Sequence, residues 1–184
     1  MRGVVGAYGS SGASASLYYD WHRRATLYRG GARVDNPDGL AVTVQSVTLG
    51  LDYGLAPDWT LGLLLPWVSY EGEMPGPGGA RLRPSGSGIG DAIAQIHHPL
   101  WGGPLARWRG AASIGVKAPT GNTGGTDPSG RLLPITAQPG TGAWDFLGVL
   151  SLTRQVSDWT FLSETSGRLN TRGNGVKSGD SVSV

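Results

Sequence analysis

Two runs of alternating apolar and polar residues, 109–117 and 143–153, flank the connector 118–142, which is rich in glycine, proline, threonine and asparagine. A period of two is typical of a β-strand with one apolar face. The four prolines of the connector exclude a helix between the two runs. Two strands joined by a long polar loop are typical of an outer-membrane barrel hairpin. The apolar set of the first run is Gly110, Ala112, Ile114 and Val116.

The same alternation recurs along the chain and predicts about eight strands. The clearest hairpin joins 42–53 to 59–70, and the apolar face of its second strand begins at Trp59 and ends at Trp67. Aromatic residues at both ends of an apolar face are expected where a strand crosses from one membrane interface to the other. The other predicted strands are 14–22, 90–98, 108–117, 143–153, 159–169 and a weak one within 173–184.

The connectors between these strands alternate in length. They are short after Tyr53, His98 and Arg154 but long at 71–87 and 118–142. Short periplasmic turns and longer extracellular loops produce this asymmetry in outer-membrane barrels. The sequence therefore predicts an all-β, antiparallel, up-and-down transmembrane β-barrel. Residues 1–184 form its single domain, with a loosely ordered segment at 1–13.

The composition fits this fold class. Charged residues make up 15% of the chain and glycine occupies 32 of its 184 positions, whereas an ordinary globular chain has about 25% charged residues. Low charge with moderate hydrophobicity follows when lipid-facing and lumen-facing positions alternate. The 15 basic and 13 acidic residues are too balanced to indicate a nucleic-acid partner. No cysteine is present, which excludes disulfides and thiolate metal sites.

Three short motifs occur in order along the chain. They are Gly-Ile-Gly-Asp at 88–91, Gly-Val-Lys-Ala-Pro-Thr-Gly-Asn at 115–122 and Gln-Pro-Gly-Thr-Gly-Ala-Trp-Asp at 138–145. The set resembles the family of outer-membrane β-barrels named for the MetA pathway of phenol degradation, and the similarity runs from roughly 17 to 169. The resemblance implies a location in the bacterial outer membrane and passive transport of small molecules, with aromatic or hydrophobic ones as candidates. It implies no catalysis and no cofactor.

Both ends of the sequence depart from a complete outer-membrane barrel. Residues 1–7 lack the apolar segment of roughly 7–15 residues that a secretory signal needs, and the chain ends in Ser-Val-Ser-Val without a terminal aromatic residue. Eight strands close only a small barrel that side chains fill. We therefore expect the N-terminal part of a larger barrel, completed by missing C-terminal strands or by a homo-oligomer.

The polar positions opposite the apolar faces predict the side chains that line the lumen. There, opposite charges can pair across strands or line a path for a solute. The predicted partners are thus membrane lipid and a small-molecule solute. The predicted lumen-lining residues are Asp52, Asp91, Arg109, Lys117, Asp145 and Glu164. The predicted lipid-interface aromatic residues are Trp59, Trp67, Trp144 and Trp159.

Other functions are less well supported by the sequence. His97 and His98 are neighbours in a strand, point to opposite faces and cannot chelate one metal together. The glycines of 86–91 precede a strand, whereas a dinucleotide-binding glycine loop precedes a helix. A serine hydrolase in the barrel wall would need a serine near His22, His97 or His98, and the spacing singles out no such set. We predict no enzyme. The main alternative is a soluble, secreted, β-rich module whose loops present Trp and Tyr side chains to a ligand.

Overall fold

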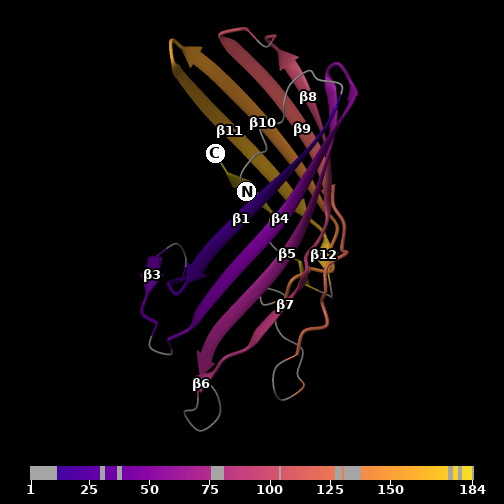
Figure 1. Cartoon of the computed structure of the whole chain (residues 1–184). Helices are drawn as coiled ribbons and strands as arrows, with labels where there is room; N and C mark the ends of the chain where they lie inside the picture. Colours follow the sequence, from indigo (N-terminus) through magenta and orange to yellow (C-terminus); the bar gives the residue numbers. More distant parts are fainter. Residues whose placement is uncertain are drawn as a thin grey trace.

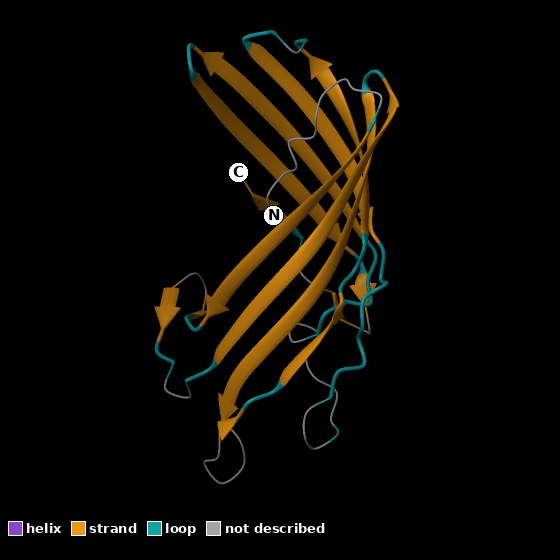
Figure 2. Cartoon of the chain, in the orientation of Figure 1, coloured by secondary structure: helices purple, strands orange, loops and turns teal. Residues whose placement is uncertain are grey.

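The main sheet of the protein is antiparallel and curls into a half-barrel (Figures 1 and 2). The computed structural model describes residues 12–29, 32–36, 39–75, 81–103, 105–126, 130, 138–173, 176–177 and 180–183. These residues contain no helix that is long and apolar enough to cross a membrane. The predicted all-β, antiparallel fold class is confirmed.

Eight strands follow one another across the sheet in chain order, which defines an up-and-down topology. Short strands extend or flank this sheet: β6 and β7 pair with β5, β2 pairs with β3, and β12 pairs with β13. The main strands are β1 (Ala13–Arg24), β4 (Ala41–Ala56), β5 (Trp59–Pro75), β8 (Ile93–Trp101), β9 (Trp108–Lys117), β10 (Asp145–Val156), β11 (Trp159–Asn170) and β14 (Ser181–Ser183). The short ones are β2 (Leu27–Arg29), β3 (Ala32–Val34), β6 (Arg81–Leu82), β7 (Ser85–Ile89), β12 (Arg172–Gly173) and β13 (Val176–Lys177).

The stretch predicted as a single loop, 71–87, contains ladder strands as well. β5 continues to Pro75, and β7 pairs with it antiparallel. The sequence of β7 is Ser-Gly-Ser-Gly-Ile, which has too few large side chains to show a hydrophobic period. The ring of Tyr70 packs against Gly86, where an added Cβ would lie only 2.5 Å from the Tyr70 hydroxyl oxygen. Glycine is therefore required at this position of the ladder.

The sheet has one apolar face and one polar face. On β4, Val47, Leu49 and Leu51 alternate with polar or small residues. On the apolar face, a Cβ added at Gly148 or Gly167 would meet no atom within 4 Å. On the polar face the side chains crowd together instead. A Cβ added at Gly50 would lie 2.5 Å from Ser16 Oγ, and one at Gly62 would lie 2.9 Å from Asp52 Oδ1. The polar face is therefore the concave one.

The two ends of the half-barrel differ (Figure 1). Tight turns at 57–58 and 157–158, together with the described residues of the connection 102–107, lie at one end, which we call the turn end. The described residues of the connections that hold β2, β3 and β6, and those of the connection 118–142, lie at the opposite end, which we call the loop end. The segment 1–11, most of the predicted loose terminus, lies outside the described residues, as do 127–129 and 131–137 of the predicted long loop.

Candidate functional site

The convex face is apolar and exposed. Leu17 is 72% exposed, Leu49 39% and Ile114 70%. Of the large apolar side chains in the described ranges, only Tyr70 is buried. A soluble sandwich packs its apolar face into a core, whereas this sheet turns its apolar face outward. An apolar surface that extends across a whole sheet indicates contact with lipid or with another protein.

Aromatic side chains border this face at both ends. At the turn end they are Tyr53, Trp59, Trp101, Trp108 and Trp159, and at the loop end they are Trp21, Trp67 and Trp144. On β5, Trp59 and Trp67 are eight residues apart, or about 27 Å of strand. At a strand tilt of about 40°, this distance spans roughly 20 Å, close to the apolar band of outer-membrane barrels, which is about 25 Å tall.

All four tryptophans that the sequence assigned to an interface are exposed. Trp59 and Trp159 lie at the turn end, and Trp67 and Trp144 lie at the loop end. Trp59 also stacks on His98, with ring centroids 4.2 Å apart. At the same end of the sheet, the guanidinium of Arg154 lies over the ring of Trp108, 4.9 Å from its centroid. Polar contacts beside the rings are expected where a membrane meets water.

A buried cluster of charges lies at the loop end of the polar face, and we call it the rim cluster: Asp91, Lys117, Thr141, Asp145 and Arg168. Lys117 Nζ lies 2.6 Å from Asp91 Oδ2 and 2.9 Å from Asp145 Oδ2. Arg168 pairs with Asp145 through both its Nε and a terminal nitrogen. The lysine and the two carboxylates are at most 6% exposed. Two cations thus neutralise two anions.

Backbone groups of the long connection complete this cluster. Asp91 Oδ1 accepts a hydrogen bond from Gly121 N at 3.0 Å, and Asp91 Oδ2 accepts one from Thr141 N at 2.9 Å. The Thr141 hydroxyl donates to the same oxygen at 2.6 Å. Residues 88–91, 115–122 and 138–145, the three motifs found in the sequence, therefore meet at a single carboxylate. The cluster fixes both ends of the 118–142 connection to the barrel wall.

These contacts hold Asp91 in its charged form. Burial raises the pKa of this carboxyl, but hydrogen bonds from Lys117, Thr141 and Gly121 outweigh burial and leave the pKa below its ordinary value. Asp91 precedes β8 and lies outside the strands. A carboxyl with a lowered pKa stabilises the folded state above the unfolded pKa of about 3.9, and this stabilisation is lost as the pH falls through the folded pKa.

We therefore expect acid to loosen the rim cluster. Between pH 7 and pH 5 the contribution of Asp91 to the urea midpoint of unfolding should stay constant. The midpoint should fall once the pH drops below about 4. The Asp91→Asn variant should start from a lower midpoint and lose less of it in acid. Urea titrations of both proteins across this range check the prediction, and equal acid losses in the two proteins would contradict it.

Three of the six predicted lumen residues come together and three do not. Five of the six lie on the polar face: Asp52, Arg109, Lys117, Asp145 and Glu164. The sixth, Asp91, lies just before β8. Asp91, Lys117 and Asp145 come together in the rim cluster. The remaining three, Asp52, Arg109 and Glu164, are not part of it.

Sequence reasoning missed two members of the cluster. Arg168 shares the polar face with Asp145, and the tight turn at 157–158 sets the register of β10 with β11. Because alternate residues of a strand share one face, the sequence of this hairpin could have placed Arg168 on the same face as Asp145. Thr141 lies in a connection without periodicity, so no sequence signal places it.

A histidine and a serine also meet on the polar face, which the spacing did not reveal. His97 Nδ1 lies 2.6 Å from Ser113 Oγ, across the β8–β9 ladder. His97 Nε2 is buried and has no hydrogen-bond partner. A Cβ added at Gly62 would lie 2.9 Å from Asp52 Oδ1 and 3.1 Å from His97 Nε2. In a serine hydrolase triad the second ring nitrogen donates to a carboxylate, and this hydrogen bond is not formed here.

The residues that the structure describes contain no group of three or more His, Cys, Asp or Glu side chains that could hold a metal ion. The fold and the rim cluster define a curled antiparallel sheet, consistent with part of a β-barrel, whose long connection is anchored to its wall. No protein-family model matches the chain, and no curated protein is significantly similar to it in sequence.

Proposed function

We propose that the chain forms the wall of a bacterial outer-membrane β-barrel that lets small molecules pass without catalysis. The observation that carries this proposal is the exposed apolar convex face with tryptophans at both ends. In lipid, such a face lies in the hydrocarbon and its aromatic borders lie at the headgroups. The three motifs behind the family resemblance support the proposal as well, because they meet in the rim cluster.

A membrane location requires closure of the sheet. Within the described part of the chain, β1 pairs only with β4, and β14 pairs only with β11. Hydrocarbon does not tolerate unpaired strand edges. Eight strands in up-and-down order leave β1 and β14 running in opposite directions, so β1 of one copy can pair antiparallel with β14 of another. Further strands supplied after β14 would close the barrel equally well.

The concave face provides the proposed solute path. Small or polar residues such as Ser16, Gly50 and Gly62 line its middle, and the charges of Asp52 and Glu164 lie along it. The rim cluster anchors Gly121 and Thr141 of the long connection at the loop end, beside the proposed entrance to this path. Aromatic or hydrophobic molecules remain the proposed solutes on the resemblance alone.

Refolding the chain into lipid vesicles tests this function. We expect a species that resists SDS and shifts in mobility on boiling, together with raised conductance and leakage of small entrapped solutes. The apparent mass of the unboiled band distinguishes a closed dimer from a monomer. A β-rich monomer that stays in plain buffer and does not bind vesicles would contradict the proposal and favour the ligand-binding module.

A further inference from the structure

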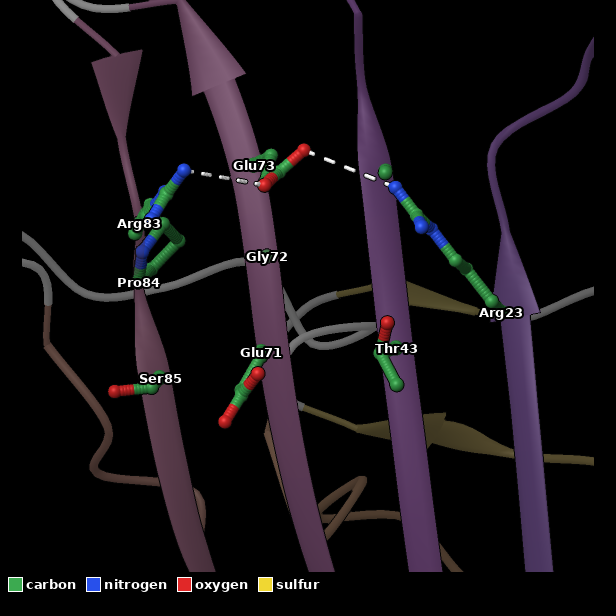
Figure 3. A pocket seen from close by; sticks show the side chains of 9 residues that line it. Arg23, Thr43, Glu71, Gly72, Glu73, Arg83, Pro84 and Ser85 are labelled. Atoms are coloured by element: carbon green, nitrogen blue, oxygen red, sulfur yellow. Dashed lines mark ion pairs between the residues drawn. The ribbon is translucent and has the colours of Figure 1, made fainter.

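A polar pocket of about 430 Å³ lies at the loop end of the sheet, across β1, β4, β5 and β7. Figure 3 shows its side chains, which come from neighbouring strands. By strand alternation, Arg23, Thr43, Glu71 and Ser85 belong to the convex face. Arg23 comes two residues after Trp21, and Glu71 comes four residues after Trp67. The pocket therefore lies just beyond the aromatic border, at the depth of lipid headgroups if the proposed membrane location holds.

The pocket carries two cations and two anions. Glu73 lies between Arg23 and Arg83, 3.9 Å and 3.7 Å from their guanidinium nitrogens (Figure 3). Both distances exceed the roughly 2.7–2.9 Å of a charge-assisted hydrogen bond. The two arginine side chains are 54% and 75% exposed. Loose, exposed ion pairs contribute little stability, so these donors are available to a ligand.

Glu71 adds a further acceptor. It lines the pocket opposite Ser85 in the β5–β7 ladder (Figure 3). The described residues provide it with no ion pair or hydrogen bond. The pocket is thus neutral overall but strongly polar, with guanidinium donors on its flanks, the Glu73 carboxylate between them and the Glu71 carboxylate beside Ser85. A simple anion would meet the repulsion of both carboxylates, and a simple cation that of both arginines. A zwitterion whose two charges are a few bonds apart matches the pocket better.

We propose that this pocket binds the phosphoethanolamine headgroup of a membrane lipid. Guanidinium groups bind phosphate oxygens through paired N–H donors, and a primary ammonium group donates hydrogen bonds to carboxylates. Arg23 and Arg83 therefore take the phosphate, and Glu71 and Glu73 take the ammonium. The acyl chains lie along the apolar face beside Trp21 and Trp67. A choline headgroup has no N–H donor for the carboxylates, and a glycerol headgroup has no positive charge.

The inference rests on the proposed membrane location, and the test separates the two. The full chain is placed in phosphatidylcholine vesicles that contain a minor fraction of dibrominated phosphatidylethanolamine, phosphatidylcholine or phosphatidylglycerol with matched acyl chains. Quenching of tryptophan fluorescence reports which lipid contacts the protein. We expect phosphatidylethanolamine to be preferred about fivefold over the other two. In Glu71→Gln and in Arg83→Gln we expect the preference to fall to less than about twofold.

The control is Asp158→Asn, which removes one carboxylate charge at the turn end, far from the pocket, and should keep the preference. An inserted protein with no preference, or a preference unchanged in both pocket variants, overturns the headgroup site and leaves the barrel proposal standing. Failure to insert into any vesicle overturns both. Binding of free phosphoethanolamine at micromolar concentration would assign the pocket to the soluble compound and overturn the lipid assignment, because the lipid relies on its anchored chains for affinity.

Discussion

Leu49→Arg is expected to block assembly of the protein in a membrane. Leu49 lies on the apolar face, between Leu17 of β1 and Leu65 of β5 in the ladder. All three side chains are exposed on the convex side. A charged side chain at the middle of the bilayer costs roughly 2–4 kcal/mol on the lipid face of a barrel. Leu63→Arg, which changes the same face one strand further on, should have the same effect.

Ser46→Arg is the matched control for this substitution. Ser46 is on the same strand but faces the polar side, opposite Asp20 of β1. An arginine there would lie on the concave face, which is the lumen side of the proposed barrel, and could pair with that carboxylate, so assembly should proceed. Vesicle flotation and the mobility shift on boiling measure both variants. If Leu49→Arg assembled as well as the unchanged protein, the convex face would not face lipid.

The period-two pattern was enough to predict the main strands and their faces. Once a strand is recognised, the alternation of its side chains decides which of them share a face. Lys117 and Asp145 could therefore be assigned to the same face before any contact was known. The tight turns at 57–58 and 157–158 added the hairpin pairs, because a short turn leaves little freedom of register. Local pattern therefore determined most of this fold.

Contacts between distant segments could not be predicted in the same way. Asp91 binds Gly121 and Thr141, which lie 30 and 50 residues further along the chain, through backbone N–H groups. Backbone donors carry no sequence signature, and the connection has no period to fix its path. The strand β7 was missed for a related reason, since alternating serine and glycine have no apolar side to detect.

The contact between His97 and Ser113 shows a third limit. Parity places both side chains on the polar face, but only the register of β8 with β9 brings them opposite each other. That register shifts between Pro99 and Trp101, near the turn that joins the two strands. Counting residues back from a turn fails across such an irregularity. A cross-strand pair of this kind becomes visible only in the structure.

Lys117→Met is expected to be the most destabilising single change on the polar face. The ammonium group of Lys117 lies between Asp91 and Asp145, whose carboxylates are 4% and 2% exposed. Removing one partner of a buried ion pair leaves an uncompensated charge and costs roughly 3–5 kcal/mol. Arg168 still neutralises Asp145, so the main loss falls on Asp91. The urea midpoint in detergent or vesicles should drop strongly.

The same variant should release the long connection. Without Lys117, water competes with Gly121 and Thr141 for hydrogen bonds to the Asp91 carboxylate, which weakens the anchor of the connection. Tryptic cleavage within 118–142 should therefore become faster. Adding Asp91→Asn to Lys117→Met removes the uncompensated charge, so the double variant should lose less stability than the two single losses combined. Arg107→Met, which removes an exposed cation at the turn end, is the matched control. Strictly additive losses would mean that Lys117 and Asp91 do not act as a unit.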